Sequence, residues 1–132
     1  MPVVDASVIV EYLAGGNQWE ETAARLLSPS ERRWAPHLVD AQVGHVLRRA
    51  VANGEVSAAT ARVAFVDLGE MPLQRAAHMG LLERAWRLRE SVSFYDGLYV
   101  ALAERLEMPL LTLDARLAKA SGVRARIEVI GA

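Results

Sequence analysis

The sequence contains no cysteine at any of its 132 positions. A chain without cysteine has no disulfide framework, no thiolate zinc site, no iron–sulfur cluster and no cysteine nucleophile. Any metal ion that it binds must therefore be held by oxygen or imidazole ligands.

Long apolar runs and an excess of basic charge are also missing. Apolar residues make up 52% of the chain, but no run of about 18 of them exists to span a bilayer. The amino terminus shows no positively charged segment followed by an apolar one, so we expect a cytoplasmic protein that does not associate with membranes. The net charge of -1 argues against a strongly basic surface that coats nucleic acid.

Short apolar segments alternate with amphipathic ones along the chain. The spacing of apolar residues predicts helices at 6–13, 19–27, 38–51, 57–69, 81–88, 93–106 and 115–119. Short strands are expected at 2–4, 33–35, 71–73, 110–113 and 127–130. Such alternation is typical of a parallel sheet covered by helices on both faces. We therefore expect one α/β domain over residues 1–132.

Three aspartates stand at positions that this fold would bring together. Asp5 and Asp114 each follow an apolar strand and precede a helix, and the carboxyl ends of parallel strands share one edge of a sheet. Asp96 opens the helix that leads into the strand before Asp114. For each aspartate taken alone, a role as a helix cap is the better explanation. Together they repel one another unless a cation compensates, so the three predict a metal site.

The expected ion is Mg²⁺ or Mn²⁺, because these hard cations prefer carboxylate oxygens and water. His37, His45 and His78 have no HxxxH spacing, and we interpret them as surface or satisfied partly buried residues. Ser7 and Thr112 stand beside the acids and are expected to support them, although local capping explains Ser7 equally well. A magnesium ion on carboxylates suits phosphodiester hydrolysis. The sequence has no phosphate-binding loop with lysine, no GxSxG and no GxGxxG after the first strand.

Four stretches of the sequence resemble the PIN-domain ribonucleases, and among them the VapC-type toxins of bacterial toxin–antitoxin pairs. The stretches are VVDASV at 3–8, APHL at 35–38 leading to VLRR at 46–49, YDGLYVALAE at 95–104 and PLLTLDARL at 109–117. The stretches occur in the order and with the spacing of the family, and the resemblance covers essentially the whole chain. The resemblance implies a three-layer α/β/α fold with a central parallel sheet of about five strands.

The same resemblance implies a Mg²⁺- or Mn²⁺-dependent endoribonuclease that acts as a homodimer on transfer RNA or another structured RNA, such as ribosomal RNA. It further implies a cognate VapB-type antitoxin whose carboxyl-terminal segment lies in a groove between helices. Asp5, Asp96 and Asp114 match the metal-binding acids of the family.

The fourth acid of the family is usually a glutamate six residues after the proline of the second stretch, and here that position is Gln42. We include Gln42 in the catalytic set, with weaker metal binding and attenuated activity expected because the charge is lost. Asp40 cannot replace it, since residues two apart do not share a helix face. The simpler interpretation is a polar residue beside Val39 and Val43, but a buried amide needs partners, which favours a polar pocket.

One other interpretation stays open, and two more lack the residues that they require. A catalytically silent PIN-like module would keep the fold and bind an antitoxin or RNA without cleaving it, and the missing glutamate favours it. A phosphoacceptor receiver domain would have an adjacent acid pair after the first strand, and a haloacid-dehalogenase-like phosphatase would have aspartate where Ser7 stands. The three tryptophans, Trp19, Trp34 and Trp86, are expected in the core more often than in an interface.

Overall fold

The computed structural model describes residues 1–28 and 31–131, and within them the chain forms one five-stranded parallel sheet. The strands lie in the order β3-β2-β1-β4-β5, with β1 in the centre between β2 and β4. Their bounds are β1 Val3–Val4, β2 Trp34–Pro36, β3 Gln74–Ala76, β4 Leu110–Thr112 and β5 Ile127–Val129. Every pair is parallel, as expected from the alternation of strands and helices.

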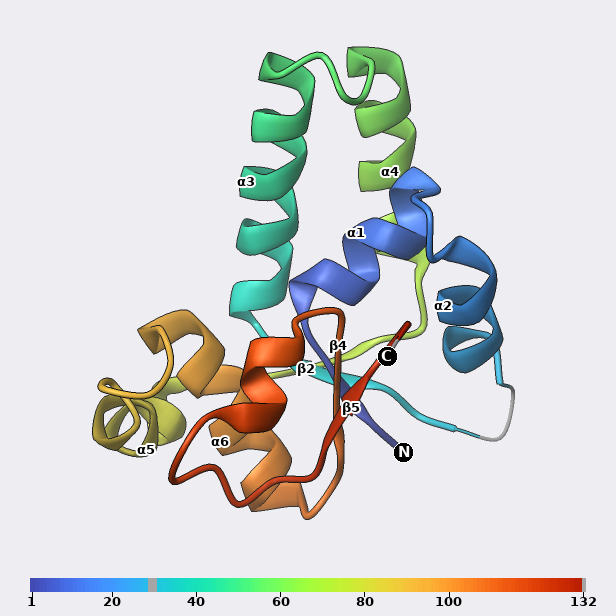
Figure 1. Cartoon of the computed structure of the whole chain (residues 1–132). Helices are drawn as coiled ribbons and strands as arrows, with labels where there is room; N and C mark the ends of the chain where they lie inside the picture. The colour runs from blue at the N-terminus through green and yellow to red at the C-terminus, as the bar shows by residue number, and fades with distance from the viewer. Residues whose placement is uncertain (29–30, 132) are drawn as a thin grey trace.

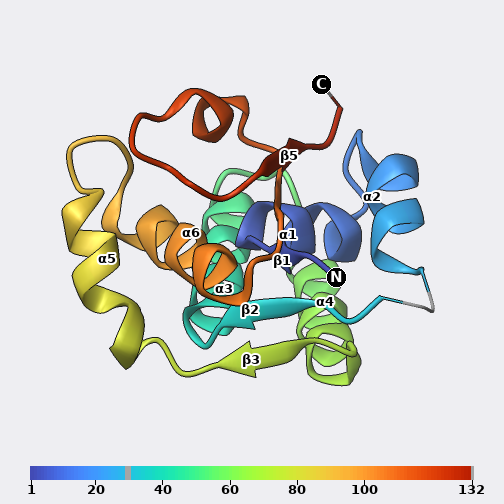
Figure 2. The same cartoon turned by 90° about the horizontal axis from the view of Figure 1, so that it is seen from below.

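Helices cover both faces of the sheet (Figures 1 and 2). Their bounds are α1 Ala6–Ala14, α2 Trp19–Leu26, α3 Leu38–Ala52, α4 Ala58–Glu70, η1 Met79–Leu81, α5 Leu82–Arg87, α6 Phe94–Leu106 and η2 Ala115–Lys119. The α1–α4 helices lie on one side of the sheet, where α3 and α4 pack against each other. On the other side α6 packs on the central strands and α5 packs on α6. The expected three-layer α/β/α architecture of the PIN type is therefore confirmed.

Local signals in the sequence define several helix ends. Asp5 caps α1, and Gly15 ends it with a left-handed backbone at φ 72°. Ser57 and Ser93 cap α4 and α6 through bonds from backbone N–H groups to their hydroxyl oxygens. Gly97 in α6 permits close packing on α5, because a Cβ at this position would lie 3.1 Å from the Ala85 backbone.

The central strands are buried. Val3, Val4, Leu110 and Leu111 are all inaccessible to solvent, and Val4 pairs with Leu111 in the sheet. The carboxyl ends of β1 and β4 therefore lie next to each other. This register places the residues that follow the two strands at one edge of the sheet.

Two predictions about the middle of the chain are wrong. The edge strand is Gln74–Ala76 and not 71–73, because Pro72 has no N–H to donate and Leu73 closes a turn by donating to the Met71 carbonyl at 2.8 Å. The expected helix at 81–88 is shorter, since it begins as the 3-10 turn η1.

The tryptophans are less buried than expected. Trp86 is 58% exposed and Trp19 is 42% exposed, and only Trp34 packs against the core as a partly buried residue. The guanidinium of Arg89 lies 4.6 Å from the centroid of the Trp86 ring, while the Trp19 ring stacks on Tyr12. These exposed rings are stabilised by their neighbours on the surface.

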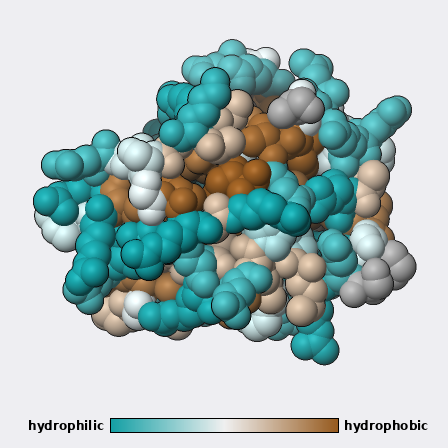
Figure 3. Space-filling view, turned by 60° about the horizontal axis from the view of Figure 1, so that its bottom comes forward, coloured by the Kyte–Doolittle hydropathy of each residue, from teal (hydrophilic) through white to brown (hydrophobic). Residues whose placement is uncertain are grey.

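The surface mixes polar and apolar residues. Figure 3 shows one face, on which hydrophilic residues surround patches of hydrophobic ones. None of the helices within 1–28 and 31–131 is long and apolar enough to cross a membrane.

Candidate active site

Asp5 lies at the carboxyl end of β1 and begins α1. Its side chain is buried, with 6% of the residue exposed, and its Oδ1 accepts a hydrogen bond from the Val8 backbone N–H at 3.3 Å. Two hydroxyls also donate to this carboxylate: Ser7 Oγ to Oδ1, and Thr112 Oγ1 to Oδ2. Burial raises the pKa of Asp5 although these three bonds lower it, and the charge of Asp96 raises it further. A nearby cation would offset this cost of holding a buried charge.

Ser7 and Thr112 connect Asp5 to the end of β4. The Ser7 hydroxyl accepts a bond from the Leu113 backbone N–H at 3.2 Å, and the Thr112 hydroxyl accepts one from the Asp114 N–H at 3.0 Å. Each hydroxyl thus donates to Asp5 and accepts from the loop after β4. The two residues hold the orientation of the Asp5 carboxylate.

Asp96 lies in the first turn of α6, where its backbone N–H donates to Ser93 Oγ at 3.1 Å. The side chain is half-buried. Burial is the largest cause that raises the pKa of Asp96, and the negative charge of Asp114 raises it further. Asp96 therefore interacts electrostatically with both other acids.

Asp114 has a different environment, because Arg116 occupies both of its carboxylate oxygens. Arg116 donates to Oδ1 through its backbone N–H at 2.9 Å and its Nε at 3.0 Å, and to Oδ2 through Nη2 at 2.9 Å. These bonds hold the pKa of Asp114 below its ordinary value. The Arg116 side chain itself is 91% exposed. Asp114 is thus kept ionised by an exposed surface arginine.

The three acids and Gln42 line one cavity of about 550 Å³ at this edge of the sheet. Within 1–28 and 31–131, however, no three acidic, histidine or cysteine side chains lie close enough together to form a ready metal cluster. The acids surround the cavity without converging on one point, since Asp114 is turned to Arg116.

Gln42 extends from α3, and its Oε1 is buried without a hydrogen-bond partner among the residues that the structure describes. Asp40, two residues earlier, instead makes a bidentate ion pair with Arg75, with atom distances from 2.8 to 3.3 Å. Asp40 does not line the cavity, as expected from its place on the helix. Gln42 therefore brings an unpartnered carbonyl oxygen to the cavity.

Sequence reasoning did not identify three ionisable residues of the cavity lining, Glu11, Glu55 and Tyr99. Glu11 Oε1 accepts the backbone N–H of Gln18 at 3.0 Å, which directs it toward the end of α1. Tyr99 follows Asp96 by three positions, and this helical spacing is the signal that could have revealed it. The three histidines do not line the cavity, and His78 Nδ1 is buried with no partner in the described part of the chain.

The donor set fits a hard divalent cation. It consists of three carboxylates, of which Asp5 and Asp96 have raised pKa values, and the unpartnered oxygen of Gln42. Oxygen ligands of this kind suit magnesium, manganese or calcium. The cation would relieve the repulsion that Asp96 experiences from its two neighbours.

Comparison with known proteins agrees with the fold. Residues 3–123 match the PIN domain family, so the chain belongs to that family. Ribonuclease VapC1 of Mycobacterium tuberculosis is 46% identical over 129 residues, which cover 97% of this chain and 96% of that protein. The chain is therefore a member of the VapC ribonucleases within the PIN domain family.

Solved structures show the same fold. The M. tuberculosis toxin VapC20, described as cleaving the sarcin–ricin loop, matches with a TM-score of 0.71 at 17% identity, over 96% of this chain and 99% of that chain. A chain of a toxin–antitoxin complex from Klebsiella pneumoniae matches with a TM-score of 0.63 at 15% identity, over 98% and 97% of the two chains.

Proposed function

We propose that this VapC ribonuclease is the toxin of a type II toxin–antitoxin pair and hydrolyses RNA phosphodiesters with Mg²⁺ or Mn²⁺ held by Asp5, Asp96 and Asp114. The observation that carries the proposal is that these three acids, together with Gln42, line one cavity at the carboxyl end of the sheet. Their order in the chain matches the family, and the relatives at 46% identity are named ribonucleases.

In this proposal, side chains of the protein orient the acidic ligands and bind the phosphate of the RNA. Ser7 and Thr112 keep the Asp5 carboxylate in one orientation, so that it needs no rearrangement when substrate arrives. Arg116 exchanges the Asp114 carboxylate for a phosphate of the RNA, because a guanidinium binds either group in a bidentate manner. When bound, the divalent cation would offset the phosphate charge and lower the pKa of an attacking water.

Gln42 limits this activity. The amide retains one oxygen for the cation but contributes no charge, so the affinity for the cation is expected to be lower than in a relative with glutamate. We therefore propose an attenuated ribonuclease, active at higher concentrations of divalent cation.

A cleavage assay tests the activity. Purified protein is incubated with total transfer RNA and ribosomal RNA at increasing Mg²⁺ or Mn²⁺, and parallel samples contain EDTA. Cleavage should require the cation and should be lost in Asp5→Asn. Equal cleavage by the parent and Asp5→Asn would assign the activity to a contaminant and overturn the proposal.

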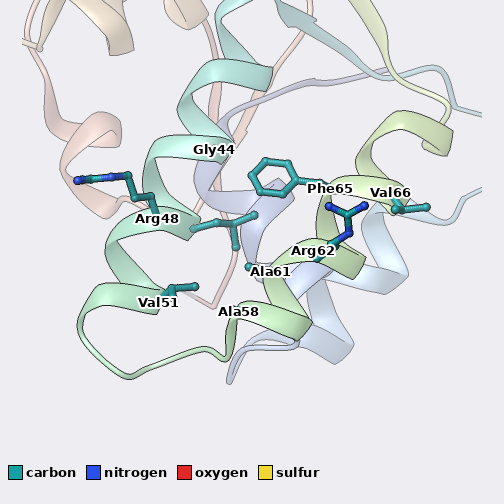
Figure 4. Close-up of a pocket in the computed structure, with 9 residues that line it drawn as sticks. Gly44, Arg48, Val51, Ala58, Ala61, Arg62, Phe65 and Val66 are labelled. Carbon is teal, nitrogen blue, oxygen red and sulfur yellow. The ribbon is translucent and has the colours of Figure 1, made fainter.

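The antitoxin is proposed to bind the groove between α3 and α4, named here the α3–α4 groove. This groove has a volume of about 640 Å³, and its lining includes Leu47, Val51, Ala61 and Phe65. Phe65 extends from α4 toward α3 (Figure 4), and its ring lies beside Gly44 of α3, where a Cβ would make an ordinary van der Waals contact with it at 3.6 Å. The groove therefore has an apolar floor wide enough for side chains of a partner.

Two exposed arginines, Arg48 and Arg62, also belong to the lining of the α3–α4 groove. An apolar floor with positive charge at its border is complementary to an amphipathic segment that carries acidic residues. This chemistry supports the carboxyl-terminal segment of a VapB-type antitoxin as the occupant.

Co-expression with the product of the neighbouring reading frame tests the partner. Phe65→Glu should weaken the complex at least tenfold, because it places a charge on the apolar floor. Val63→Glu is the matched control, since Val63 is 59% exposed on the same helix and does not line the groove. Equal loss of binding in both variants would place the antitoxin elsewhere.

The alternative function is a catalytically silent PIN module that binds an antitoxin or RNA without cleaving it. Gln42 and the ion pair between Asp114 and Arg116 favour it, because both reduce the free negative charge in the cavity. Calorimetry separates the two functions. If the protein is a silent module, calorimetry should show no saturable Mn²⁺ site. In that case Gln42→Glu should also gain no RNA cleavage.

A further inference from the structure

An exposed aromatic side chain stands next to the acidic cavity in the first turn of α6. Tyr95 directly precedes Asp96 and is 56% exposed, whereas Tyr99, which lines the cavity, is 1% exposed. Residues three and four apart on a helix share a face, so Tyr99 lies on one face with both Asp96 and Tyr95. Burial decreases along this face from Tyr99 through the half-buried Asp96 to Tyr95. The face therefore leads from the inside of the cavity to the surface at Tyr95.

The ring of Tyr95 differs from the exposed tryptophan rings, because it has no stacking partner. Trp86 is covered by a guanidinium, and Trp19 stacks on another ring. Among the residues that the structure describes, the Tyr95 side chain makes no hydrogen bond, ring stack or guanidinium contact. An exposed aromatic ring gains hydrophobic and stacking free energy when a flat ligand covers it. Tyr95 is therefore free to stack on such a ligand beside the cavity.

Positive charge lies near the same acid. The Arg116 side chain is 91% exposed, and its charge acts on Asp96 as well as on Asp114. A guanidinium binds phosphate in a bidentate manner, whereas an aromatic ring stacks on a nucleobase. The surroundings of Asp96 thus provide one exposed group for the phosphate of a nucleotide and another for its base.

We propose that an unpaired base of the RNA substrate stacks on Tyr95, next to the phosphodiester that enters the acidic cavity. This inference rests on the proposed function and deepens it, because it defines the substrate as RNA with a nucleotide outside a helix at the cleaved position. A base in a duplex is stacked between its neighbours, whereas a base in a loop, bulge or single strand has a free face. Because every base has such a face, Tyr95 selects unpaired RNA and not a particular sequence.

Phe94 provides a matched control in the same turn of α6. It is 38% exposed, but the residues three and four positions further on are Gly97 and Leu98, which are both buried. A Cβ at Gly97 would lie 3.1 Å from Ala85, so this face of α6 packs against α5. Phe94 is therefore an aromatic residue of the same helix end on a different face from Tyr95.

Binding of two RNA probes tests the stacking. Both are labelled oligomers of about ten nucleotides, a length that single-strand sites contact: an oligoadenylate and an oligomer with the same ribose–phosphate backbone but no bases. Fluorescence anisotropy is measured with Mn²⁺ in the Asp5→Asn background, so that neither probe is cleaved. Tyr95→Leu should weaken oligoadenylate binding at least about fivefold, because the base loses its stacking partner. Binding of the probe without bases should change less than about twofold, because it has nothing to stack.

Three further variants separate the ring from other effects. Tyr95→Phe keeps the ring and should retain the affinity for oligoadenylate, and Phe94→Leu should change the binding of neither probe. Arg116→Ala should weaken both probes, because it removes a phosphate contact that does not depend on the base. Urea unfolding of Tyr95→Leu should match that of the background protein, since the ring is exposed.

Several outcomes would overturn the proposal. Equal weakening of both probes by Tyr95→Leu would mean that the residue acts on the backbone of the RNA or on the fold. Unchanged affinity for oligoadenylate, or no binding of either probe to the background protein, would also reject the stacking. If Tyr95→Leu weakened only the antitoxin complex, the ring would belong to that interface. The proposed function fails separately, when the parent cleaves no RNA at any Mn²⁺ concentration, and the two probes decide the role of Tyr95 in either case.

Discussion

The Thr112 hydroxyl donates a hydrogen bond to Asp5 Oδ2, and the two residues are 107 positions apart in the chain. The parallel pairing of Val4 with Leu111 makes this possible, because it aligns the ends of β1 and β4. The same hydroxyl accepts the Asp114 backbone N–H, so one side chain connects two of the three acids. The geometry of the site is therefore part of the central sheet.

Thr112→Val tests this connection, because it keeps the side-chain volume and removes the hydroxyl. The Asp5 oxygen is then buried without that donor, and the free energy of unfolding should fall by about 1–3 kcal/mol. Loss of the donor also raises the pKa of Asp5 further. Urea unfolding at pH 7 measures the effect. Thr112→Ser retains the hydroxyl and should preserve Mn²⁺ affinity, whereas unchanged affinity in Thr112→Val would show that Asp5 needs no such support.

Gln42→Glu should raise Mn²⁺ affinity about tenfold or more and increase cation-dependent RNA cleavage. The added carboxylate supplies the charge that the amide lacks, and ligand charge is a main determinant of affinity for hard cations. In EDTA the same variant should be less stable than the parent, because a fourth negative charge joins the acids. Gln74→Glu adds the same charge on an exposed residue of β3 and should change neither property. If Gln42→Glu bound Mn²⁺ no more tightly than the parent, Gln42 would not belong to the metal site.

The free energy of unfolding should depend on pH through Asp5 and Asp96. The pKa of each is higher in the folded protein than its ordinary value, mainly because of burial. Between the ordinary and the raised value, the folded state binds more protons than the unfolded state. Stability in EDTA therefore falls as pH rises through this window and is regained as pH decreases.

Asp96→Asn isolates the contribution of Asp96. At pH 7 in EDTA the variant should be more stable than the parent by about 1 kcal/mol, because a buried, repelled charge is gone. The difference should vanish below the ordinary pKa of an aspartate. Groups whose pKa values are lowered, such as Glu104 beside Arg84, make stability depend on pH in the opposite direction. They are present in both the parent and Asp96→Asn, so their contribution cancels in the difference between the two. Mn²⁺ should stabilise the parent but not Asp96→Asn. If Asp96→Asn were less stable than the parent at pH 7, burial and repulsion of the Asp96 charge would not be costly in the folded protein.

Arg116→Ala should raise Mn²⁺ affinity about twofold to fivefold, because Asp114 is then free to bind the cation. Stability should hardly change, since the arginine side chain is 91% exposed and its ion pair is screened by solvent. The KM for RNA should increase if the guanidinium contacts phosphate. Arg87→Ala is the control, because it breaks an exposed ion pair with Glu83 on α5. Unchanged metal affinity in Arg116→Ala would mean that Asp114 takes no part in binding.

The fold could be predicted well because its signals are local. Val3 and Val4 form a buried strand, Asp5 caps the next helix, and the same pattern recurs from Leu110 to Asp114. The exposed Trp86 was mispredicted because apolar spacing does not reveal which faces of a short helix have a packing partner. The strand at Gln74 was misplaced by three residues because its position depends on pairing with Trp34, far away in the chain.

The sequence by itself determined the α/β class and the position of Asp5 and Asp114 at strand ends. These depend on short-range periodicity and capping, which act within a few residues. Only the tertiary structure decided that Thr112 and Ser7 bind Asp5, that Arg116 occupies Asp114, and that Tyr99 and Gln42 enter the same cavity unpartnered. Burial and hydrogen-bond saturation depend on what packs around a side chain, and that environment comes from strands and helices distant in sequence.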